Sequence, residues 1–150
     1  MGEPTIPDWA ADLGLVAHPE GGFFAETWRT DQQVPAGALP AEYAGDRAAA
    51  TGIYFLLAAG QRSAWHLVRS DELWLWHRGT SVVLLLGGSA ARPGAVTEIR
   101  LGPDIAAGER PQVRIPGGVW QATAPVQEAV LVSCVVSPGF DYVDFALEPS

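Results

Sequence analysis

Short apolar runs separated by turn residues dominate the chain from Thr51 onward. They cover residues 51–57, 63–68, 72–77, 81–86, 96–101, 112–115, 119–123 and 129–136, and Gly, Pro or charged residues separate most of them. Runs of this length are typical of β-strands, and almost no helical periodicity lies between them. The pattern predicts an all-β protein, an antiparallel sandwich or barrel of the jelly-roll kind.

The first part of the chain follows a different pattern. The segment Pro7–Leu15 predicts a short helix with Asp8 as its N-cap. Residues 18–22 have the composition of a turn, and the aromatic and β-favouring residues of 23–28 predict a strand. Residues 31–50 are rich in Ala, Gly, Pro and polar residues. We expect this stretch to form a surface excursion with one helical turn.

Composition and charge exclude several functions. With 150 residues, of which 48% are hydrophobic, the chain is sized for a single domain over residues 1–150. The formal net charge of −8 opposes binding to nucleic acid, whose phosphates require clustered basic residues. All nine basic residues are Arg, so neither a Schiff-base lysine nor a P-loop lysine is possible. A Gly-x-Ser-x-Gly motif of serine hydrolases is also absent.

The sequence favours a cytoplasmic protein. No apolar run approaches the roughly 18 residues that span a bilayer, and Met1–Pro4 lack the basic and apolar regions that begin a signal peptide. We therefore expect no membrane partner. The single Cys134 cannot form an intramolecular disulfide and suits a reducing compartment. Because it lies in an apolar run, we expect a buried, inert thiol.

Two neighbouring runs, 63–68 and 72–77, bring a histidine and a carboxylate together. If they form a hairpin, Val68 lies opposite Glu72 and His66 lies opposite Trp74. Residues that are directly opposed, or two apart, share a face of the sheet. His66 and Glu72 would then project on one side among indole rings, as a functional pair or as a satisfied polar pair in an ordinary core.

The spacing of these residues resembles a known motif. Gly60, His66, Glu72 and Gly79 reproduce most of the first cupin motif, Gly-x5-His-x-His-x3,4-Glu-x6-Gly. Residues 116–121 resemble the core of the second motif, Pro-x-Gly-x2-His. Here Gln121 occupies the histidine position.

Three further segments are similar to the DUF985, or cupin 5, family of the cupin superfamily over about residues 12–147. The resemblance implies a double-stranded β-helix with an interior pocket, assembled as a homodimer. We expect the segment after His18 to pair with, or pack on, the second subunit. The segments that carry the resemblance are 18–23 with Glu26 and Arg29, 70–74, and 137–142 with Asp144 and Phe145.

The resemblance also bears on metal binding. Metal-binding cupins use two His and a Glu from the first motif and a His from the second. This chain offers His66, Glu72 and the neutral amide of Gln121, while Val68 stands at the second histidine position. We therefore expect no cofactor; if a metal is present, His66, Glu72 and Gln121 would hold it. His18 and His77 are assigned structural or surface roles.

Without a metal, His66 and Glu72 can act as an acid/base pair. The unperturbed pKa of His lies close to cellular pH, and a neighbouring carboxylate raises the basicity of the ring. His66 is then the base and Glu72 its orienter or the acid, with Tyr142 or Tyr54 as a further acid. The predicted binding residues, which exclude water and stack on a ring, are Trp74, Trp76, Trp120, Gln121, Glu26 and Tyr54.

These residues favour a metal-independent isomerase, epimerase or lyase that acts on a small sugar- or nucleoside-like substrate. Two alternatives stay open: a non-catalytic module that binds or senses a small molecule, and a metal-dependent oxygenase. Arg62 and Arg114 could meet an anionic group of a substrate or lie in solvent.

Overall fold

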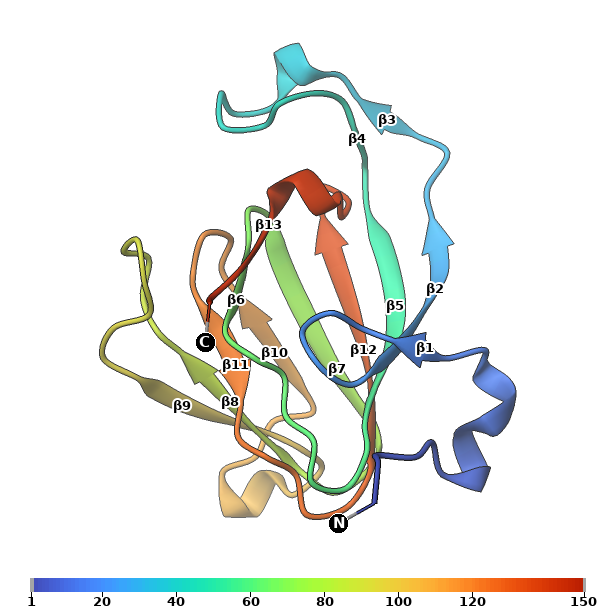
Figure 1. Cartoon of the computed structure of the whole chain (residues 1–150). Coiled ribbons are helices and arrows are strands. Elements are labelled where there is room, and N and C mark those ends of the chain that lie inside the picture. The colour runs from blue at the N-terminus through green and yellow to red at the C-terminus, as the bar shows by residue number, and fades with distance from the viewer. Residues whose placement is uncertain (1, 150) are drawn as a thin grey trace.

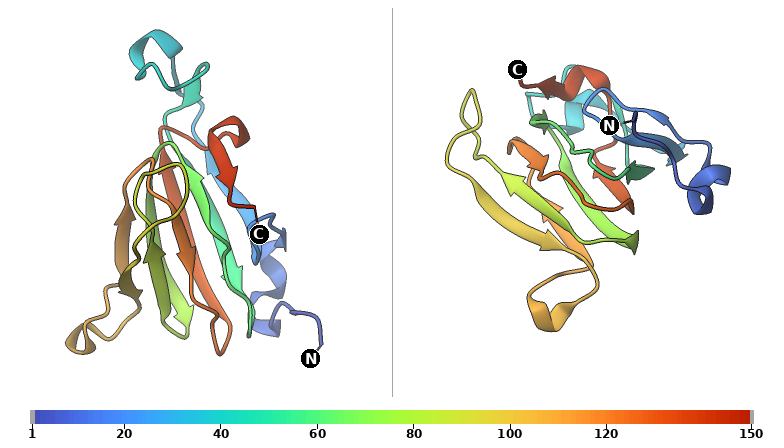
Figure 2. Two further views of the ribbon diagram at one scale, coloured as in Figure 1. Left: turned by 60° about the vertical axis from the view of Figure 1, so that its left-hand side comes forward. Right: turned by 60° about the horizontal axis from the view of Figure 1, so that its bottom comes forward.

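The computed structural model describes residues 2–149 and contains two antiparallel sheets that face each other (Figures 1 and 2). The first has the strand order β1 (Val16–Ala17), β2 (Phe23–Arg29), β5 (Thr51–Leu57), β12 (Val130–Ser137), β7 (Asp71–Gly79) and β10 (Gln112–Ile115). The second has the order β13 (Phe145–Leu147), β6 (His66–Val68), β11 (Gln121–Thr123), β8 (Val82–Leu86) and β9 (Thr97–Leu101). The all-β jelly-roll prediction is confirmed.

Alternation of side chains along the strands produces the core. Residues of β12 are buried at Val130, Val132, Cys134 and Val136, and the residues between them are half-buried. This period of two places one row of each strand between the sheets. Phe55, Trp74 and Val132 from the six-stranded sheet pack with Val82 and Leu84 from the five-stranded sheet, and together they form the centre of the core.

The N-terminal segments differ from the prediction in detail. The expected helix is a six-residue 3-10 segment, η1 (Asp8–Leu13), and it ends at Gly14, which has a left-handed φ of 70°. Pro7 occupies the N-cap position and Asp8 the first turn, so the predicted Asp8 cap is wrong. Residues 31–50 form the expected excursion, with η2 (Ala36–Ala38) between β3 (Gln33–Val34) and β4 (Arg47–Ala48). Across residues 2–149, every helical segment is too short to span a membrane.

The predicted hairpin between β6 and β7 is wrong. β6 pairs with β11 and β13 in the five-stranded sheet, whereas β7 pairs with β12 and β10 in the six-stranded sheet. The short connection through Arg69 and Ser70 therefore passes from one sheet to the other. His66 and Glu72 still face the same interior, because the inner faces of the two sheets are turned toward each other.

The edge of the six-stranded sheet bears on assembly. β1 pairs only with Phe23 and Phe24 of β2. The remaining residues of β2, among the part of the chain described, have a neighbouring strand on one side only, and Trp28 is 47% exposed there. An open edge with an exposed aromatic side chain is a surface that a second chain can pair with.

The homodimer stays a prediction, and we expect the open edge of β2 to form its interface. Light scattering at micromolar concentration should give twice the mass of the chain. Trp28→Glu should shift the protein toward the monomer, because a charge on the open part of the β2 edge opposes association. Val96→Glu, at an exposed apolar residue in the connection between β8 and β9, serves as the control and should leave the mass unchanged. A monomeric mass for the unmodified protein would contradict the prediction.

Candidate functional site

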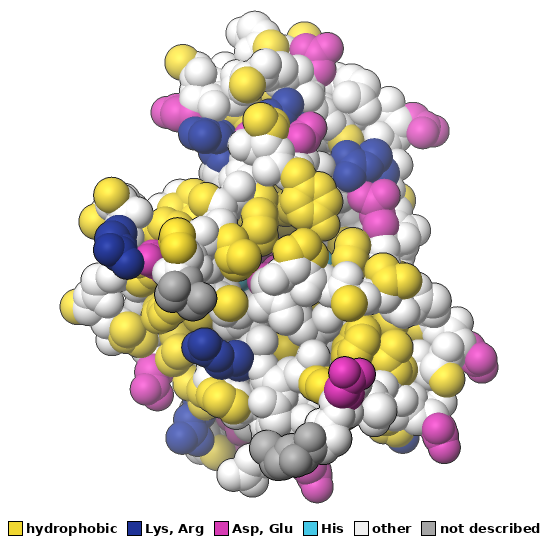
Figure 3. All heavy atoms as spheres, viewed as in Figure 1, with side chains coloured by type: hydrophobic (Ala, Val, Ile, Leu, Met, Phe, Trp, Pro, Cys, Tyr) yellow, Lys and Arg dark blue, Asp and Glu magenta, His cyan; other side chains and the backbone are white. Residues whose placement is uncertain are grey.

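A cavity of about 500 Å³ opens between the sheets at the end of the barrel that the C-terminal segment covers. In the space-filling view of Figure 3, hydrophobic side chains surround a hollow on this face. Four strands, β2, β5, β6 and β12, contribute most of the wall. The turn before β2 and residues 140–145, which include η4 (Tyr142–Asp144), contribute the rest, with Glu72 of β7. The lining residues are His18, Glu20, Phe24, Glu26, Arg29, Thr51, Ile53, His66, Val68, Glu72, Cys134, Val136, Phe140, Asp141, Tyr142 and Phe145.

Glu20 lies between two histidines at the buried part of this cavity. Its Oε2 is 3.3 Å from Nε2 of His66, and its Oε1 is 3.4 Å from Nδ1 of His18. Oε2 also accepts a hydrogen bond from the hydroxyl of Ser63. All four side chains are withdrawn from solvent, so they form one buried polar cluster that joins the β1–β2 turn to the segment around β6.

Hydrogen bonds to the backbone fix the tautomer of each neutral imidazole. Nδ1 of His66 is 2.8 Å from the carbonyl oxygen of Ala64, so this nitrogen carries the ring proton and Nε2 keeps its lone pair. Nδ1 of His18 accepts the backbone N–H of Glu20 at 3.1 Å, so its proton lies on Nε2. Neutral His66 therefore presents an acceptor to Glu20.

Glu72 is positioned by hydrogen bonds from residues of the core. Nε2 of Gln121 donates to Oε1 of Glu72 at 2.8 Å, and Oε1 of Gln121 accepts from Nε1 of Trp74 at 3.0 Å. The Cys134 thiol also hydrogen-bonds Glu72. Gln121 thus orients Glu72 from the core and does not itself line the cavity. Cys134 is buried as expected, but it lines the cavity beside Glu72.

Burial sets the protonation of this cluster. Desolvation raises the pKa of Glu20 to about 8, although the Ser63 hydrogen bond opposes the rise. Desolvation also raises the pKa of Glu72 to about 6, with the nearby His66 acting against it. Burial lowers the pKa of His18 to about 4 and lowers that of His66, which Glu72 partly offsets. Near neutral pH the two rings are uncharged, Glu20 holds a proton and Glu72 is ionised.

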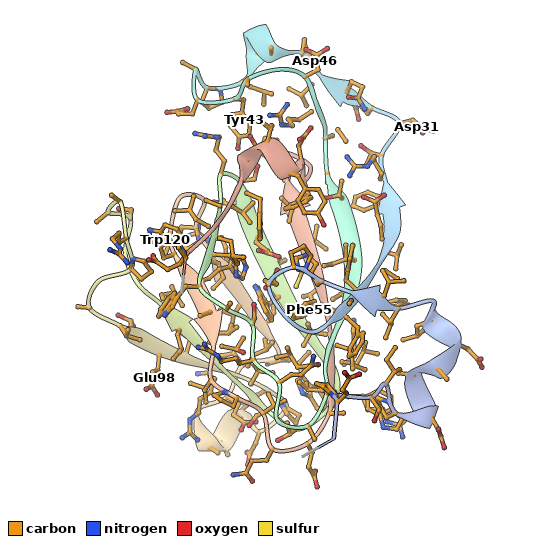
Figure 4. All side chains as sticks on the ribbon, viewed as in Figure 1. Asp31, Tyr43, Asp46, Phe55, Glu98 and Trp120 are labelled. Atoms are coloured by element: carbon orange, nitrogen blue, oxygen red, sulfur yellow. The ribbon has the colours of Figure 1, made fainter. Side chains whose placement is uncertain are left out.

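The three tryptophans predicted to bind the substrate lie away from the cavity. Trp74 lies in the core, Trp76 donates to the carbonyl of Thr80, and Trp120, labelled in Figure 4, donates to the carbonyl of Ala90. None of them lines the cavity. Successive inward residues of a strand are about 7 Å apart, so the Trp residues of β7 lie progressively farther than Glu72 from the cavity.

The two candidate tyrosines lie on different faces. Tyr54 is on the outer face of the six-stranded sheet, where its ring meets His77 at 6.3 Å, so it does not reach the cavity. His77 contacts the Ser133 hydroxyl at 2.6 Å on that face, as its alternation with Glu72 predicts. Tyr142 does line the cavity, but at its mouth, where it is 53% exposed. Its predicted role as an acid stays a prediction.

The mouth of the cavity contains an ion pair. Glu26 lines the cavity and pairs with Arg29 at 2.7 Å, and Arg29 also donates to the carbonyl of Phe140 at 3.2 Å. Of the other two arginines considered from the sequence, Arg114 lies 3.4 Å from Asp71 in solvent, and Arg62 is outside the cavity lining.

Sequence reasoning missed the roles of His18 and Glu20. Both lie in the 18–23 segment that carries the family resemblance, and that resemblance was their one signal in the sequence. Spacing could not connect them with His66, because the β1–β2 turn reaches the cavity only through the pairing of β2 with β5. His18 was assigned a structural or surface role, and its buried ring instead forms part of the cavity wall.

The excursion of residues 31–50 holds η4 in place over the cavity. Arg47 of β4 forms a buried pair with Asp144 of η4, in which Nε lies 2.8 Å from Oδ2 and Nη2 lies 3.0 Å from Oδ1. Arg69 adds a contact of 3.5 Å to the same carboxylate. Figure 4 shows Tyr43 above this C-terminal turn, and its hydroxyl lies 2.8 Å from that of Ser70.

The cavity does not fit the metal-ligand set that the cupin motifs imply. Val68 has no donor atom, and both polar atoms of the Gln121 amide are occupied by Trp74 and Glu72. No group of three or more His, Cys, Asp or Glu side chains within the described chain is arranged to hold a metal ion.

Comparisons with known proteins agree with the fold. A family model described as Cupin superfamily (DUF985) matches residues 7–148. The uncharacterized protein YML079W of Saccharomyces cerevisiae is 32% identical, over 95% of this chain and 72% of that protein. The crystal structure of protein SO0799 from Shewanella oneidensis is 37% identical with a TM-score of 0.79, over 94% and 82% of the two chains. A hypothetical protein from Leishmania major is 33% identical with a TM-score of 0.81, over 93% and 85%.

The buried Arg47–Asp144 pair should contribute strongly to stability. Arg47→Met leaves most of the Asp144 carboxylate buried without its partner, and we expect unfolding to become easier by about 3 kcal/mol. Arg92→Met is the matched control, because Arg92 pairs with Glu148 and its side chain is 78% exposed. This substitution should lower the free energy of unfolding by less than about 1 kcal/mol. Urea denaturation measures both, and equal losses would contradict this prediction.

The pKa of Glu20 predicts how stability varies with pH. The unfolded chain loses this proton near pH 4.5, whereas the folded protein keeps it up to about pH 8. Raising the pH therefore favours unfolding until about pH 8. His18 and His66 act in the opposite direction, but only below about pH 6.5, where the unfolded rings take up protons.

We therefore expect the melting temperature to fall between about pH 6.5 and 8, the window in which Glu20 acts without the histidines. Glu20→Gln should remove most of this fall, because it removes the titrating group. Glu26→Gln, at a half-exposed carboxylate, should retain it. If the melting temperature of Glu20→Gln falls as much as that of the unmodified protein, another group causes the pH dependence.

Proposed function

This chain belongs to the DUF985 family of the cupin superfamily, and we propose that it is a metal-independent isomerase, epimerase or lyase. It moves a proton next to a carbonyl group of a small substrate. One observation carries this proposal. At the buried end of the cavity, the Glu20 carboxyl group lies 3.3 Å from Nε2 of His66, and Glu72, which Gln121 holds, lines the same cavity. Burial raises the pKa of both carboxyl groups and lowers the pKa of the imidazole.

Groups whose environments separate their pKas in this way can act as acid and base at one pH. His66 is the base, because its Nδ1 proton is engaged by Ala64 and its Nε2 keeps a lone pair. In the resting site this lone pair faces Glu20, and it takes up the substrate proton when Glu20 gives its own proton to the substrate. Glu20 is the acid, because it holds a proton at neutral pH. Glu72 is the ion that stabilises the imidazolium when His66 takes up a proton.

His66 and Glu20 return to their starting protonation states after one catalytic cycle. His66 removes the proton from the carbon next to the carbonyl, and the Glu20 proton goes to the carbonyl oxygen, which gives an enol. Return of a proton from His66 to carbon, and of a hydroxyl proton to Glu20, restores both groups. The site of protonation decides the product. Protonation of the former carbonyl carbon gives an isomer, and the hydroxyl group on the adjacent carbon then returns its proton to Glu20. An epimer forms when the original carbon is protonated on its other face, which requires the enol to turn in the cavity before His66 returns the proton.

The lining also bears on the substrate. We propose a ring-bearing substrate of the sugar or nucleoside kind. The tryptophans are absent from the wall, and the faces available to a ring come from Phe24, Phe140, Tyr142 and Phe145. The pocket is of the size that encloses a small molecule.

Exchange of hydrogen with solvent tests the reaction whatever its product is. In D₂O, the protein should introduce deuterium next to the carbonyl of at least one member of a panel of sugars, nucleosides and keto acids, followed by NMR. His66→Gln and Glu20→Gln should each slow exchange by roughly 10²–10⁴, the usual contribution of a positioned acid or base. His77→Gln, on the outer face, is the matched histidine control and should exchange at the normal rate.

Two results would contradict the proposal. Loss of exchange with a chelator, restored by Fe, Mn, Ni or Zn, would show a metal-dependent enzyme. Binding of a panel member with no exchange at any pH would show a non-catalytic binding module. Circular dichroism of each variant separates loss of chemistry from loss of fold.

A further inference from the structure

The charges on the cavity wall indicate what kind of ligand the cavity accepts. Besides the thiol of Cys134 and the phenol of Tyr142, its ionisable side chains comprise four carboxyl groups, a single arginine and two histidines that are uncharged near neutral pH. Glu72 is ionised at the buried end, and Glu26 and Asp141 lie at the more exposed mouth. Glu20 is the exception, because burial keeps its proton in place.

The single arginine does not change this balance. Its Nη2 lies 2.7 Å from Oε1 of Glu26, and its Nη1 donates to the carbonyl of Phe140. The charge of Arg29 is therefore matched by a neighbouring carboxylate, and two of its donors are used within the protein. A phosphate or carboxylate ligand would meet more negative than positive charge along this wall.

Aromatic rings form the other part of the mouth. The ring of Phe140 lies 4.9 Å from that of Tyr142, at 84° between the planes, and 6.1 Å from that of Phe145, at 68°. The rings of Tyr142 and Phe145 are 5.9 Å apart, at 79°. Three rings at steep angles present faces and edges in several directions, and the face of a phenyl or phenol ring attracts a cation.

We propose that this cavity binds an organic cation, an amine or quaternary ammonium group carried by the small molecule on which the protein acts. The rings of Phe140, Tyr142 and Phe145 contact the alkyl groups of the cation. Asp141 at the mouth and Glu72 at the buried end supply the negative charge that remains after Arg29 is paired with Glu26. The proposal deepens the proton-transfer function by naming the charge of its substrate. It concerns binding, so it is tested without turnover.

The location of the anchoring contacts supports this assignment. Asp141 accepts the backbone N–H of Val143 through Oδ1, which fixes the start of η4 and with it Tyr142. Asp144, at the end of the same turn, is fixed by Arg47. The aromatic group is therefore held in place before a ligand arrives. The chain as a whole carries a net charge of −8, which attracts cations to its surface.

Choline and its neutral isostere 3,3-dimethylbutan-1-ol test the proposal, because they have the same shape and differ in charge. By NMR titration of the unmodified protein, choline should bind at least about tenfold more tightly than the alcohol, since a desolvated cation gains from the rings and carboxylates. Inorganic phosphate should not compete with choline. Equal binding of choline and the alcohol, or tighter binding of phosphate, would overturn the proposal.

Tyr142 provides a matched pair of variants. Tyr142→Leu removes the ring and should weaken choline binding by about two- to fivefold, with a smaller effect on the alcohol. Tyr142→Phe keeps the ring and should bind choline as the unmodified protein does. Because this side chain is more than half exposed, both variants should fold. Equal weakening by the two substitutions would show that the hydroxyl, not the ring, contacts the ligand, and would overturn the aromatic contact.

The two proposals fail in different ways. Deuterium exchange into an uncharged substrate, with no preference for choline, would retain the proton-transfer function and reject the cationic ligand. Preference for choline, with no exchange into any carbonyl compound, would retain the ligand class and reject the chemistry.

Discussion

Burial of the Glu20 carboxyl group between His18 and His66 is the constraint from which the properties of the cavity follow. A carboxylate removed from water without a compensating charge is costly, so the group keeps its proton and its pKa rises to about 8. The same loss of water keeps both rings uncharged. A site that excludes solvent thereby stores a proton at neutral pH beside a histidine that can accept one.

The rest of the structure keeps this cluster satisfied. Among the described residues, no buried side-chain nitrogen or oxygen lacks a hydrogen-bond partner. Gln121 is central to this, because its single amide connects Trp74 to Glu72 between the two sheets. An amide at this position satisfies a buried carboxylate and an indole at once, whereas a metal-binding histidine would be directed at a ligand. The departure from the cupin motif is therefore coupled to the packing of the core.

The position of η4 over the cavity depends on contacts between segments that are distant in the sequence. Arg47, at the end of the excursion, and Asp144, near the C-terminus, form a buried pair that positions η4. The aromatic rings of the mouth and Asp144 all lie within residues 140–145. The contacts that hold η4 thus also order the surface that meets the ligand, which reduces the cost of ordering it on binding.

The sequence by itself determined the strand pattern, the all-β jelly-roll class and the inward direction of His66 and Glu72, because the alternation of side chains is a local property of a strand. Local pattern also indicated the excursion and the outer position of His77. It could not decide which strands pair, so the predicted hairpin of β6 with β7 was wrong, and the tryptophans predicted to bind the substrate lie away from the cavity. The tertiary structure alone decided that Glu20 lies between His18 and His66, that Gln121 faces the core, and that phenylalanines form the mouth. These placements depend on contacts between segments far apart in the chain, and their pKas depend on burial, which only the assembled sheets create.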